Sequence, residues 1–275
     1  MSPLVHPMTS EEHRLLDEFV SELFGLHFPE DKKDILASRL EPRLQALRLH
    51  RFLDYYLLLQ YDSSEEIEHL ARLVSNNESY FFREIRQFEA LFEEGVDHMA
   101  ATSDEPTMRF LCAGCSSGEE PYTLSIYCSQ HAGKFFGRNV SIQGFDIDHT
   151  RITAAERASY TKNSLRVASE EQIRNHFSRN GDEYELQQRY RKSVSFTHGN
   201  ILDLPTYPAS NYDAIFCRNV LIYFSEPALH RAVENFAAAL RPGGLLFLGH
   251  SESIIGLTPS LETVRLDRCI AYERV

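Results

Sequence analysis

The fold is decided by the stretch Phe110-Leu-Cys-Ala-Gly-Cys-Ser-Ser-Gly-Glu-Glu-Pro-Tyr122, in which an apolar strand enters a turn of small residues and then a helix. Two carboxylates, Glu119 and Glu120, open that helix. Acidic residues at this position repel phosphate and suit a cofactor that carries amines and hydroxyls. S-adenosylmethionine has those groups, so the stretch predicts a turn that binds it. The same residues also fit an ordinary strand-to-helix turn, in which the glutamates stabilise the helix dipole and Pro121 is tolerated near the helix start.

The chain after about residue 105 alternates strand patterns with helix patterns, which is typical of a mostly parallel sheet with helices on both faces. The expected strands lie in residues 108–112, 140–145, 194–198, 213–217 and 240–248, and residues 261–274 are expected to form an antiparallel hairpin around Asp267-Arg268. A terminal antiparallel hairpin on a parallel sheet resembles the Rossmann-like methyltransferase architecture. The fold class is therefore α/β, with a seven-stranded sheet expected.

Polar residues follow several of these strands, where open α/β sheets bind their ligands. Asp146 ends the second strand and is the candidate to hold ribose hydroxyls. The interval from Gly114 to Asp146 is longer than the roughly 20 residues of the dinucleotide fingerprint, which disfavours a nicotinamide enzyme. Asn200 follows the third strand and is a candidate for recognising the adenine edge. Arg218 follows the fourth strand.

The first hundred residues show helix patterns and no strand signal, which predicts a small all-α N-terminal domain. We expect this domain and its linker to cover residues 1–88, and the methyltransferase domain to cover residues 89–275. The first helix is expected to begin with a cap at Ser10 and to end at Gly25.

The second helix carries a flanking basic stripe that consists of Lys32, Arg39 and Arg43. The stripe is either a solvated face or a docking surface for an acidic helical partner. Pro42 lies inside this helix and is expected to kink or split it, because proline removes one backbone hydrogen bond.

Composition narrows the possible partners of the 275-residue chain. Its formal net charge of −12 argues against a nucleic-acid binder. It has five cysteines, no signal-peptide pattern and no apolar run long enough to span a membrane, which predicts a cytoplasmic protein with free thiols and no membrane insertion. Cys112 and Cys115 have Cys-x-x-Cys spacing, but a second pair is lacking, so we expect no metal. We also expect a monomer.

Five motifs in a fixed order carry a resemblance to a known family. They are Asn77-Glu-Ser-Tyr-Phe-Phe-Arg83-Glu84, Ser116-Ser-Gly-Glu-Glu-Pro-Tyr122, Asp146-Ile-Asp148, Phe216-Cys-Arg-Asn-Val-Leu-Ile-Tyr-Phe224 and Gly249-His-Ser-Glu-Ser253. On these motifs the chain resembles the CheR family of chemotaxis-receptor glutamate methyltransferases. The resemblance implies methyl transfer from S-adenosylmethionine to glutamate γ-carboxylates on cytoplasmic receptor helices, which gives methyl esters and S-adenosylhomocysteine.

The resemblance also implies which residues form the site. The cofactor-contact positions are Asn77, Ser79, Arg83, Glu119, Asp146, Asn200, Ile201, Cys217 and Arg218. Arg83 and Tyr223 match the positions closest to the transferred methyl group. A substrate carboxylate is already ionised at neutral pH, so it needs orientation rather than a general base. The planar fork of Arg83 is suited to orient a carboxylate, either that of the substrate or that of the cofactor, and Tyr223 donates one hydrogen bond.

Residues 163–193 are too many for a simple connection between two strands and predict an inserted antiparallel β-subdomain. We expect a capped helix over Ser169–Phe177 and strand-like pieces in residues 184–191 around the turn Asn180-Gly181-Asp182. In the family, this subdomain in some members binds a receptor's C-terminal peptide tether by adding a strand. The segment between Phe177 and Tyr184 is short, which argues against tether binding in this chain.

Two other functions stay open on the sequence alone. One is a catalytically idle module that senses S-adenosylmethionine and binds receptors, against which Arg83 and Tyr223 count. The other is a methyltransferase that acts on a non-receptor substrate. The motif after the fourth strand lacks the Asn-Pro-Pro-aromatic pattern typical of amine methylation, and an assay for methyl esters separates the alternatives.

Overall fold

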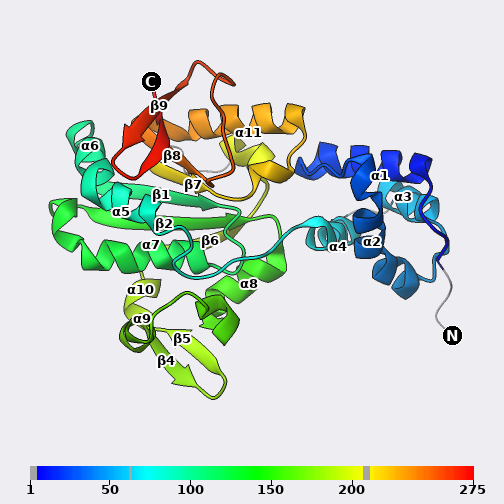
Figure 1. Cartoon of the computed structure of the whole chain (residues 1–275), viewed down its shortest axis with the longest axis horizontal. Coiled ribbons are helices and arrows are strands. Elements are labelled where there is room, and N and C mark those ends of the chain that lie inside the picture. The colour runs from blue at the N-terminus through cyan, green and yellow to red at the C-terminus, as the bar shows by residue number, and fades with distance from the viewer. Residues whose placement is uncertain (1–4, 62–63, 207–210) are drawn as a thin grey trace. The chain divides into compact units, whose positions relative to one another are not determined.

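The computed structural model describes residues 5–61, 64–206 and 211–275, which divide into two compact units (Figure 1). The N-terminal unit holds the residues up to Asn76 together with Tyr223–Leu229. The sheet unit holds Asn77–Ile222 and His230–Val275. The division after Asn76 comes before residue 88, so the segment that carries Arg83 belongs to the sheet unit.

The N-terminal unit is built from helices, as predicted. They are α1 (Ser10–Phe24), the 3-10 helix η1 (Glu30–Lys32), α2 (Lys33–Leu47), α3 (Phe52–Tyr61) and α4 (Ser64–Val74). The cap of α1 is Thr9, so the prediction of Ser10 was wrong by one residue. The Thr9 hydroxyl accepts from the backbone N–H of Glu12 at 3.2 Å, and the Glu12 carboxylate accepts from the backbone N–H of Thr9 at 2.9 Å. This reciprocal pair is a capping box, and Ser10 has no such partner three residues on. Gly25 ends α1 at φ 79°, as predicted.

Helix α2 is one continuous helix across Pro42, so the proline does not split it. Pro42 is exposed, whereas Leu36, Leu40 and Leu44 are fully buried. These leucines recur every four residues and form one stripe against the core of the unit. Burial of the stripe stabilises the helix despite the backbone hydrogen bond that proline removes.

The segment Tyr223–Leu229 packs with the end of α1 inside the N-terminal unit. Leu26 and Phe224 form an antiparallel bridge. The N–H of His27 donates to the carbonyl of Tyr223 at 2.8 Å, and the N–H of Ser225 donates to the carbonyl of Gly25 at 2.8 Å. A residue far along the chain is thereby fixed to the first helix of the protein.

The sheet unit contains a sheet of seven strands, counted over the described residues, in the order β6-β2-β1-β7-β8-β10-β9. The strands are β1 (Thr107–Ala113), β2 (Asn139–Asp146), β6 (Val194–His198), β7 (Tyr212–Cys217), β8 (Leu240–Leu248), β9 (Leu261–Leu266) and β10 (Cys269–Arg274). The first five strands in this order, from β6 through β2, β1 and β7 to β8, pair in parallel. Strand β10 runs antiparallel to β8 and β9. The predicted sheet with its terminal hairpin is confirmed.

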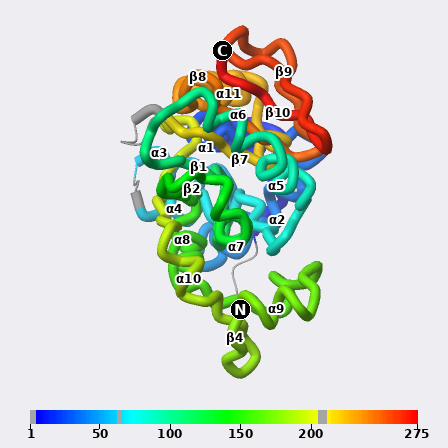
Figure 2. Tube along the Cα trace, turned by 90° about the vertical axis from the view of Figure 1, so that its left-hand side faces the viewer, coloured from blue at the N-terminus to red at the C-terminus, as the bar shows by residue number. Residues whose placement is uncertain are grey.

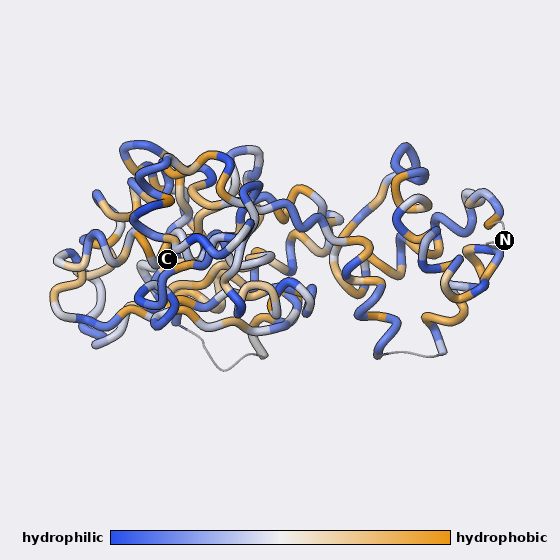
Figure 3. The backbone as a smooth tube through the Cα atoms, turned by 90° about the horizontal axis from the view of Figure 1, so that it is seen from below, coloured by the Kyte–Doolittle hydropathy of each residue, from blue (hydrophilic) through white to orange (hydrophobic). Residues whose placement is uncertain are grey.

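Along the chain, the helices of the sheet unit come after the linker and between the strands. They are α5 (Arg86–Ala90), the π-helix η2 (Leu91–Gly95), α6 (Val96–Ala101), α7 (Glu119–Gln130), α8 (His149–Arg157), α11 (Glu226–Ala239), which starts in the other unit, and the 3-10 helices η3 (Ala132–Phe135), η5 (Ile201–Thr206) and η6 (Leu221–Tyr223). Phe88 stacks on Phe216 at 5.2 Å between ring centres, and Phe216 stacks on Phe247 at 4.7 Å. This core joins the helices to the strands. Figure 3 shows hydrophobic stretches alternating with hydrophilic ones along the backbone.

An inserted three-stranded antiparallel sheet has the order β3-β5-β4 and projects away from the large sheet (Figures 1 and 2). Its elements are β3 (Ser159–Tyr160), η4 (Lys162–Leu165), α9 (Glu170–His176), β4 (Phe177–Asn180), β5 (Glu183–Leu186) and α10 (Gln188–Arg191). The capped helix is confirmed, because Ser169 forms a capping box with Gln172.

Two details of the insertion differ from the prediction. Strand β3 begins at Ser159, before residue 163, and residues 188–191 are helical rather than strand-like. Tyr190 lies four residues after Leu186 and is buried in the same core, where its hydroxyl is 2.8 Å from the His176 ring. A helical turn brings such a pair to one side, whereas an extended chain of this length would carry Tyr190 past the core.

Candidate cofactor site

The turn after β1 is held against the end of β2 and admits glycine only at two positions. The N–H groups of Gly114 and Cys115 both donate to the carbonyl of Phe145, at 2.7 and 3.0 Å. Gly114 has φ 75°, and a Cβ there would lie 2.5 Å from Cγ2 of Val220. Gly118 has φ 88°, and a Cβ there would also clash with its neighbours. The backbone of the turn is therefore packed closely against the loop after β7, against α8 and against β6.

Asp146 ends β2 with its carboxylate oriented by two backbone donors. One oxygen accepts from the N–H of Ser116 at 2.7 Å, and the other accepts from the N–H of Asp148 at 2.9 Å. The residue is 6% exposed, and burial raises the pKa of its carboxyl to about 6, although the two N–H groups oppose this shift. Each oxygen keeps a further lone pair, which suits it to accept ribose hydroxyls.

The linker between the two units runs directly past this carboxylate. The Asn77 side-chain amide donates to Asp148 at 2.9 Å, and the Ser116 hydroxyl donates to the carbonyl of Asn77 at 3.0 Å. Three sequence motifs that are distant along the chain thus meet at the cofactor turn. Ser79 is half-buried in the same linker.

Glu119 is a buried carboxylate surrounded by hydroxyl groups. It is 1% exposed, and it accepts from the hydroxyl of Ser117 at 3.0 Å and from that of Ser164 at 3.0 Å. Ser164 comes from the insertion, so Glu119 ties the insertion to the cofactor turn. A buried carboxylate whose hydrogen-bond donors are neutral is well suited to an added cationic group, such as the ammonium of an amino acid.

Arg218 is engaged with protein groups rather than open to a ligand. Nη1 lies 3.0 Å from Glu120, Nη2 donates to the carbonyl of Arg83 at 2.7 Å, and the guanidinium lies 5.2 Å from the ring centre of Phe88. Burial raises the pKa of Glu120, and Arg218 partly offsets that rise. The structure gives Arg218 a bracing role that the sequence did not predict.

Arg83 and Glu84 lie beside this brace. Nη1 of Arg83 donates to the carbonyl of Glu78 at 3.3 Å, and its Nε lies 3.8 Å from Glu84. Glu84 is also 3.4 Å from Arg218 and 3.0 Å from His250. Burial opposes ionisation of Glu84, but Arg218 and His250 more than offset it and lower its pKa. Sequence reasoning gave no role to Glu84 or His250, although both lie in quoted motifs.

The remaining predicted positions lie at the ends of β6 and β7. The Asn200 side-chain oxygen accepts from the N–H of Leu202 at 3.0 Å and so caps η5. Ile201 is 7% exposed, and Cys217 is fully buried. Burial raises the pKa of the Cys217 thiol well above its ordinary value, so the thiol is neutral. The cofactor contacts expected of these residues stay predictions.

Tyr223 belongs to the N-terminal unit, whereas the other predicted site residues lie in the sheet unit. It is half-buried, and its hydroxyl accepts from the side-chain amide of Asn76 at 2.6 Å. The hydroxyl hydrogen is therefore left to point toward another acceptor.

Two residues of the basic stripe have partners within the N-terminal unit, and the docking role expected of the stripe stays a prediction. Arg43 is ion-paired with Glu66 at 2.5 Å, and the hydroxyl of Tyr55 donates to the same carboxylate at 2.8 Å. Arg39 donates to the carbonyl of Val74 at 2.5 Å. Lys32 is exposed.

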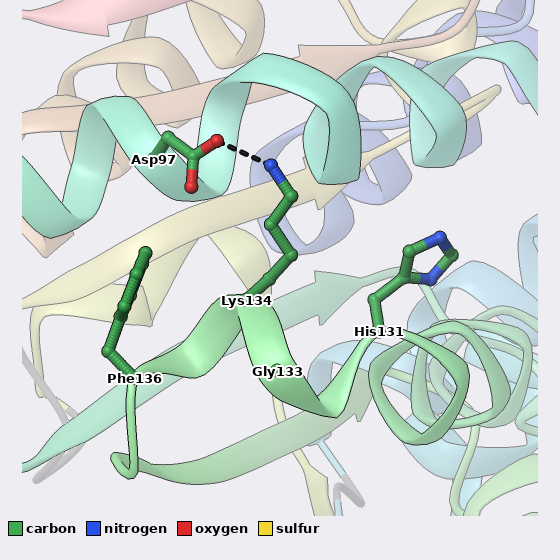
Figure 4. A pocket seen from close by; sticks show the side chains of 5 residues that line it. All are labelled: Asp97, His131, Gly133, Lys134 and Phe136. Carbon is green, nitrogen blue, oxygen red and sulfur yellow. Dashed lines mark hydrogen bonds and ion pairs between the residues drawn. The ribbon is translucent and has the colours of Figure 1, made fainter.

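A separate hollow of about 500 Å³ lies at the other end of β2, where η3 precedes the strand (Figure 4). It is lined by Asp97, His131, Gly133, Lys134 and Phe136. Lys134 is paired with Asp97 at 2.5 Å, so its charge is already matched. The hollow contains none of the residues that the sequence singled out.

Across residues 5–61, 64–206 and 211–275, no cluster of three or more His, Cys, Asp or Glu side chains is arranged to hold a metal. Within the same ranges, no helix combines the length and the apolar character needed to cross a membrane.

A parallel sheet with a terminal antiparallel hairpin, a glycine turn after β1 and a buried aspartate after β2 define a Rossmann-like methyltransferase that uses S-adenosylmethionine. Residues 77–270 match the family described as CheR methyltransferase, SAM binding domain. Residues 11–75 match CheR methyltransferase, all-alpha domain. The chain belongs to the CheR family of chemotaxis methyltransferases.

Curated relatives match along most of both chains. A chemotaxis protein methyltransferase 2 of Vibrio cholerae is 33% identical over 90% of this chain and 87% of the relative. A protein of the same description from Pseudomonas aeruginosa is 32% identical over 90% of this chain and 88% of the relative. A chemotaxis protein methyltransferase of Klebsiella aerogenes is 31% identical over 90% of this chain and 84% of the relative.

Proposed function

We propose that this protein methylates side-chain carboxylates of specific glutamates on the cytoplasmic helices of chemoreceptors, with S-adenosylmethionine as methyl donor. The products are glutamyl methyl esters and S-adenosylhomocysteine. The observation that carries the proposal is the placement of Arg83 beside the cofactor turn, where its carbonyl is held by Arg218. The chemotaxis methyltransferases that match most of the chain support the same assignment of substrate.

The cofactor is assigned to the turn between β1 and α7. Asp146 would accept hydrogen bonds from the ribose hydroxyls, and Glu119 would pair with the ammonium group of the methionine part. Asn200 and Ile201 would border the adenine. Gly114 has φ 75° and Gly118 has φ 88°, so the turn has a backbone conformation that glycine adopts without strain. When bound, S-adenosylmethionine supplies an electrophilic methyl group on a sulfonium.

The protein's task in this reaction is orientation of the acceptor. A glutamate carboxylate is ionised at neutral pH and is already a nucleophile, so no general base is required. Arg83 would hold the carboxylate through one or two N–H groups, and Tyr223 would donate one hydrogen bond from its hydroxyl. Because the acceptor loses its charge in the transition state, these contacts must orient it without binding the ionised form too strongly.

The partner we assign is the helical cytoplasmic region of a chemoreceptor. Lys32 is the exposed charge of the basic stripe and is the residue through which the stripe would contribute to docking. Strand β4 is short, with residues Phe177–Asn180, so we assign no tether to it.

The test is incubation of the protein with S-adenosylmethionine labelled in its methyl group and a cytoplasmic receptor fragment. We expect label that is released as methanol by mild base, because carboxyl esters hydrolyse under those conditions. A folded protein that binds S-adenosylhomocysteine but labels nothing is an idle sensor. Label that resists base, or that appears only on another substrate, contradicts the proposal and supports a non-receptor methyltransferase.

A further inference from the structure

Glu252 gathers four backbone N–H groups on one carboxylate, in the segment that follows β8. One oxygen accepts from Val220 at 2.9 Å and from Ile222 at 3.2 Å. The other accepts from Asn219 at 2.8 Å and from Gly249 at 2.6 Å. A carboxylate has about four lone-pair sites, so this side chain is saturated by the backbone.

Three of these donors belong to Asn219–Ile222, the loop that directly follows Arg218. Asn219 has φ 61°, a left-handed conformation that asparagine adopts more readily than most other residues. Val220 fills the space beside Gly114 in the cofactor turn. The loop thus joins the cofactor turn to the residue that braces Arg83, and the Glu252 carboxylate holds its backbone through three hydrogen bonds.

We propose that Glu252 is a positioning residue for methyl transfer. Its carboxylate holds the Asn219–Ile222 loop, and this loop places Val220 against the cofactor turn. The start of the loop also positions Arg218, which donates to the carbonyl of Arg83. The inference rests on the proposed function, because it assigns Glu252 to the orientation of groups that bind cofactor and acceptor.

The chemistry of the site requires a carboxylate. In Glu252→Gln, one oxygen becomes an NH₂ group that donates and cannot accept. Either orientation of the amide leaves two backbone N–H groups facing a donor, which costs the desolvation of both groups. The site has little room to adjust, since a Cβ on Gly249 would lie 2.8 Å from the Glu252 carboxylate.

A matched control lies at the opposite end of β7. Asp213 is a buried carboxylate that accepts from the backbone N–H of Arg109 at 2.7 Å and from Nε of Arg241 at 2.6 Å. Asp213→Asn therefore also removes a carboxylate that accepts a backbone N–H, and Asp213 lies on β7 itself. It does so at the amino end of that strand, whereas the loop that Glu252 holds follows its carboxyl end.

The experiment compares wild type, Glu252→Gln, Glu252→Asp and Asp213→Asn in the full chain. The measurements are thermal unfolding, the Kd of S-adenosylhomocysteine by calorimetry, and kcat and KM for ester formation. We expect kcat to fall by about 10- to 100-fold in Glu252→Gln, because a small misplacement of reacting groups has effects of this size. The kcat of Glu252→Asp should lie between that of Glu252→Gln and that of wild type. Asp213→Asn should lower the unfolding temperature while its kcat at a temperature where it is folded stays within about twofold of wild type.

The inference is overturned if folded Glu252→Gln or folded Glu252→Asp has the same kcat and the same Kd as wild type. So does an equal loss of kcat in Asp213→Asn, since the effect would then be general destabilisation. If wild type forms no ester, the proposed function fails. The Kd of S-adenosylhomocysteine then still decides the inference, because it needs no methyl acceptor: weaker binding in the Glu252 variants alone supports the positioning role, and equal binding overturns it.

Discussion

Nη2 of Arg218 donates a hydrogen bond to the backbone carbonyl oxygen of Arg83 at 2.7 Å. The contact joins the end of β7 to the linker that precedes α5, and a third group, Glu120, fixes the other arm of the same guanidinium at 3.0 Å. The position of Arg83 is therefore set by an ion pair between the end of β7 and helix α7, and not by the linker itself.

Replacement of Arg218 by methionine is expected to destabilise the protein by about 3–5 kcal/mol, because Glu120, whose side chain is 17% exposed, would lose its cation. Chemical denaturation at neutral pH measures the change. The matched control is Arg14→Met, since Arg14 forms ion pairs with Glu11 and Glu18 at the surface, and that variant should unfold like wild type. Equal stability of the Arg218 variant and wild type would show that the buried pair contributes nothing.

Arg83→Ala is expected to lose methyl transfer by about 100-fold or more, because orientation of the acceptor is its proposed role. The Kd of S-adenosylhomocysteine in the same variant separates the two carboxylates that Arg83 can bind. An unchanged Kd assigns it to the substrate, and a weakened Kd assigns it to the cofactor. Wild-type turnover in Arg83→Ala would remove Arg83 from the mechanism.

The affinity for S-adenosylhomocysteine is expected to depend on pH through Asp146. Burial raises the pKa of this carboxyl to about 6 from 3.8. The folded state therefore binds this proton more tightly than the unfolded state does. The group stabilises the folded protein at low pH, and this contribution is lost as pH rises from 3.8 through about 6. The ionised form is the better acceptor for ribose hydroxyls, so affinity should increase as pH rises through about 6 and then level off. Calorimetric titrations from about pH 5 to pH 8 should show this rise in affinity. Because only one group titrates, the Kd should change by no more than about tenfold per pH unit. Asp146→Asn should show weak, flat binding, and a wild-type affinity independent of pH would contradict the account.

Phe81→Ala is expected to destabilise the sheet unit by about 3–5 kcal/mol, the usual cost of deleting a buried aromatic ring. Phe81 is fully buried and meets Tyr160 edge-on at 4.7 Å and Phe177 edge-on at 4.9 Å between ring centres. These rings join the linker to the insertion. Phe81→Leu keeps most of the apolar volume and should cost clearly less in urea unfolding. Equal losses in both variants would contradict this account, because they would show that apolar volume without the aromatic ring contributes nothing at this position.

Tyr223→Phe is expected to lower kcat while the Kd of S-adenosylhomocysteine stays unchanged, because the hydroxyl donates to the acceptor and not to the cofactor in the proposed mechanism. Asn76→Ala should lower kcat less, since it removes only the amide that orients the hydroxyl. In the double variant, loss of Asn76 should add little to loss of the hydroxyl. Additive effects would show that the two residues act separately.

The sequence predicted the parts of the fold that rest on local patterns. Alternating strand and helix signals placed every strand of the large sheet, and the position of Asp146 at the end of β2 follows from that order. It missed Thr9 as the cap of α1, because Thr9 and Ser10 are both hydroxyl residues and only the spacing to Glu12 distinguishes them. It also missed the start of the insertion at Ser159, since β3 has two residues and no periodicity to read.

The bracing contacts escaped prediction because they join residues that are far apart along the chain. Arg218 and Arg83 are 135 residues apart, and Glu252 and Asn219 are 33 residues apart. The motif pattern placed Arg218 at the ligand edge of the sheet, which is correct for its backbone. It gave no sign that Glu120 and the carbonyl of Arg83 would occupy its side chain. The attachment of Tyr223 to the end of α1 is a long-range contact of the same kind.

The central claim is tested most directly by mass spectrometric mapping of methyl groups on a cytoplasmic receptor fragment after incubation with the protein and S-adenosylmethionine. The account predicts one methyl group on each of a few specific glutamates of the receptor helices. It also predicts loss of the methyl groups on mild base treatment and their absence with Arg83→Ala that still folds. A receptor fragment that stays unmodified while wild-type protein binds S-adenosylhomocysteine, or methyl groups found on residues other than glutamate, would contradict it.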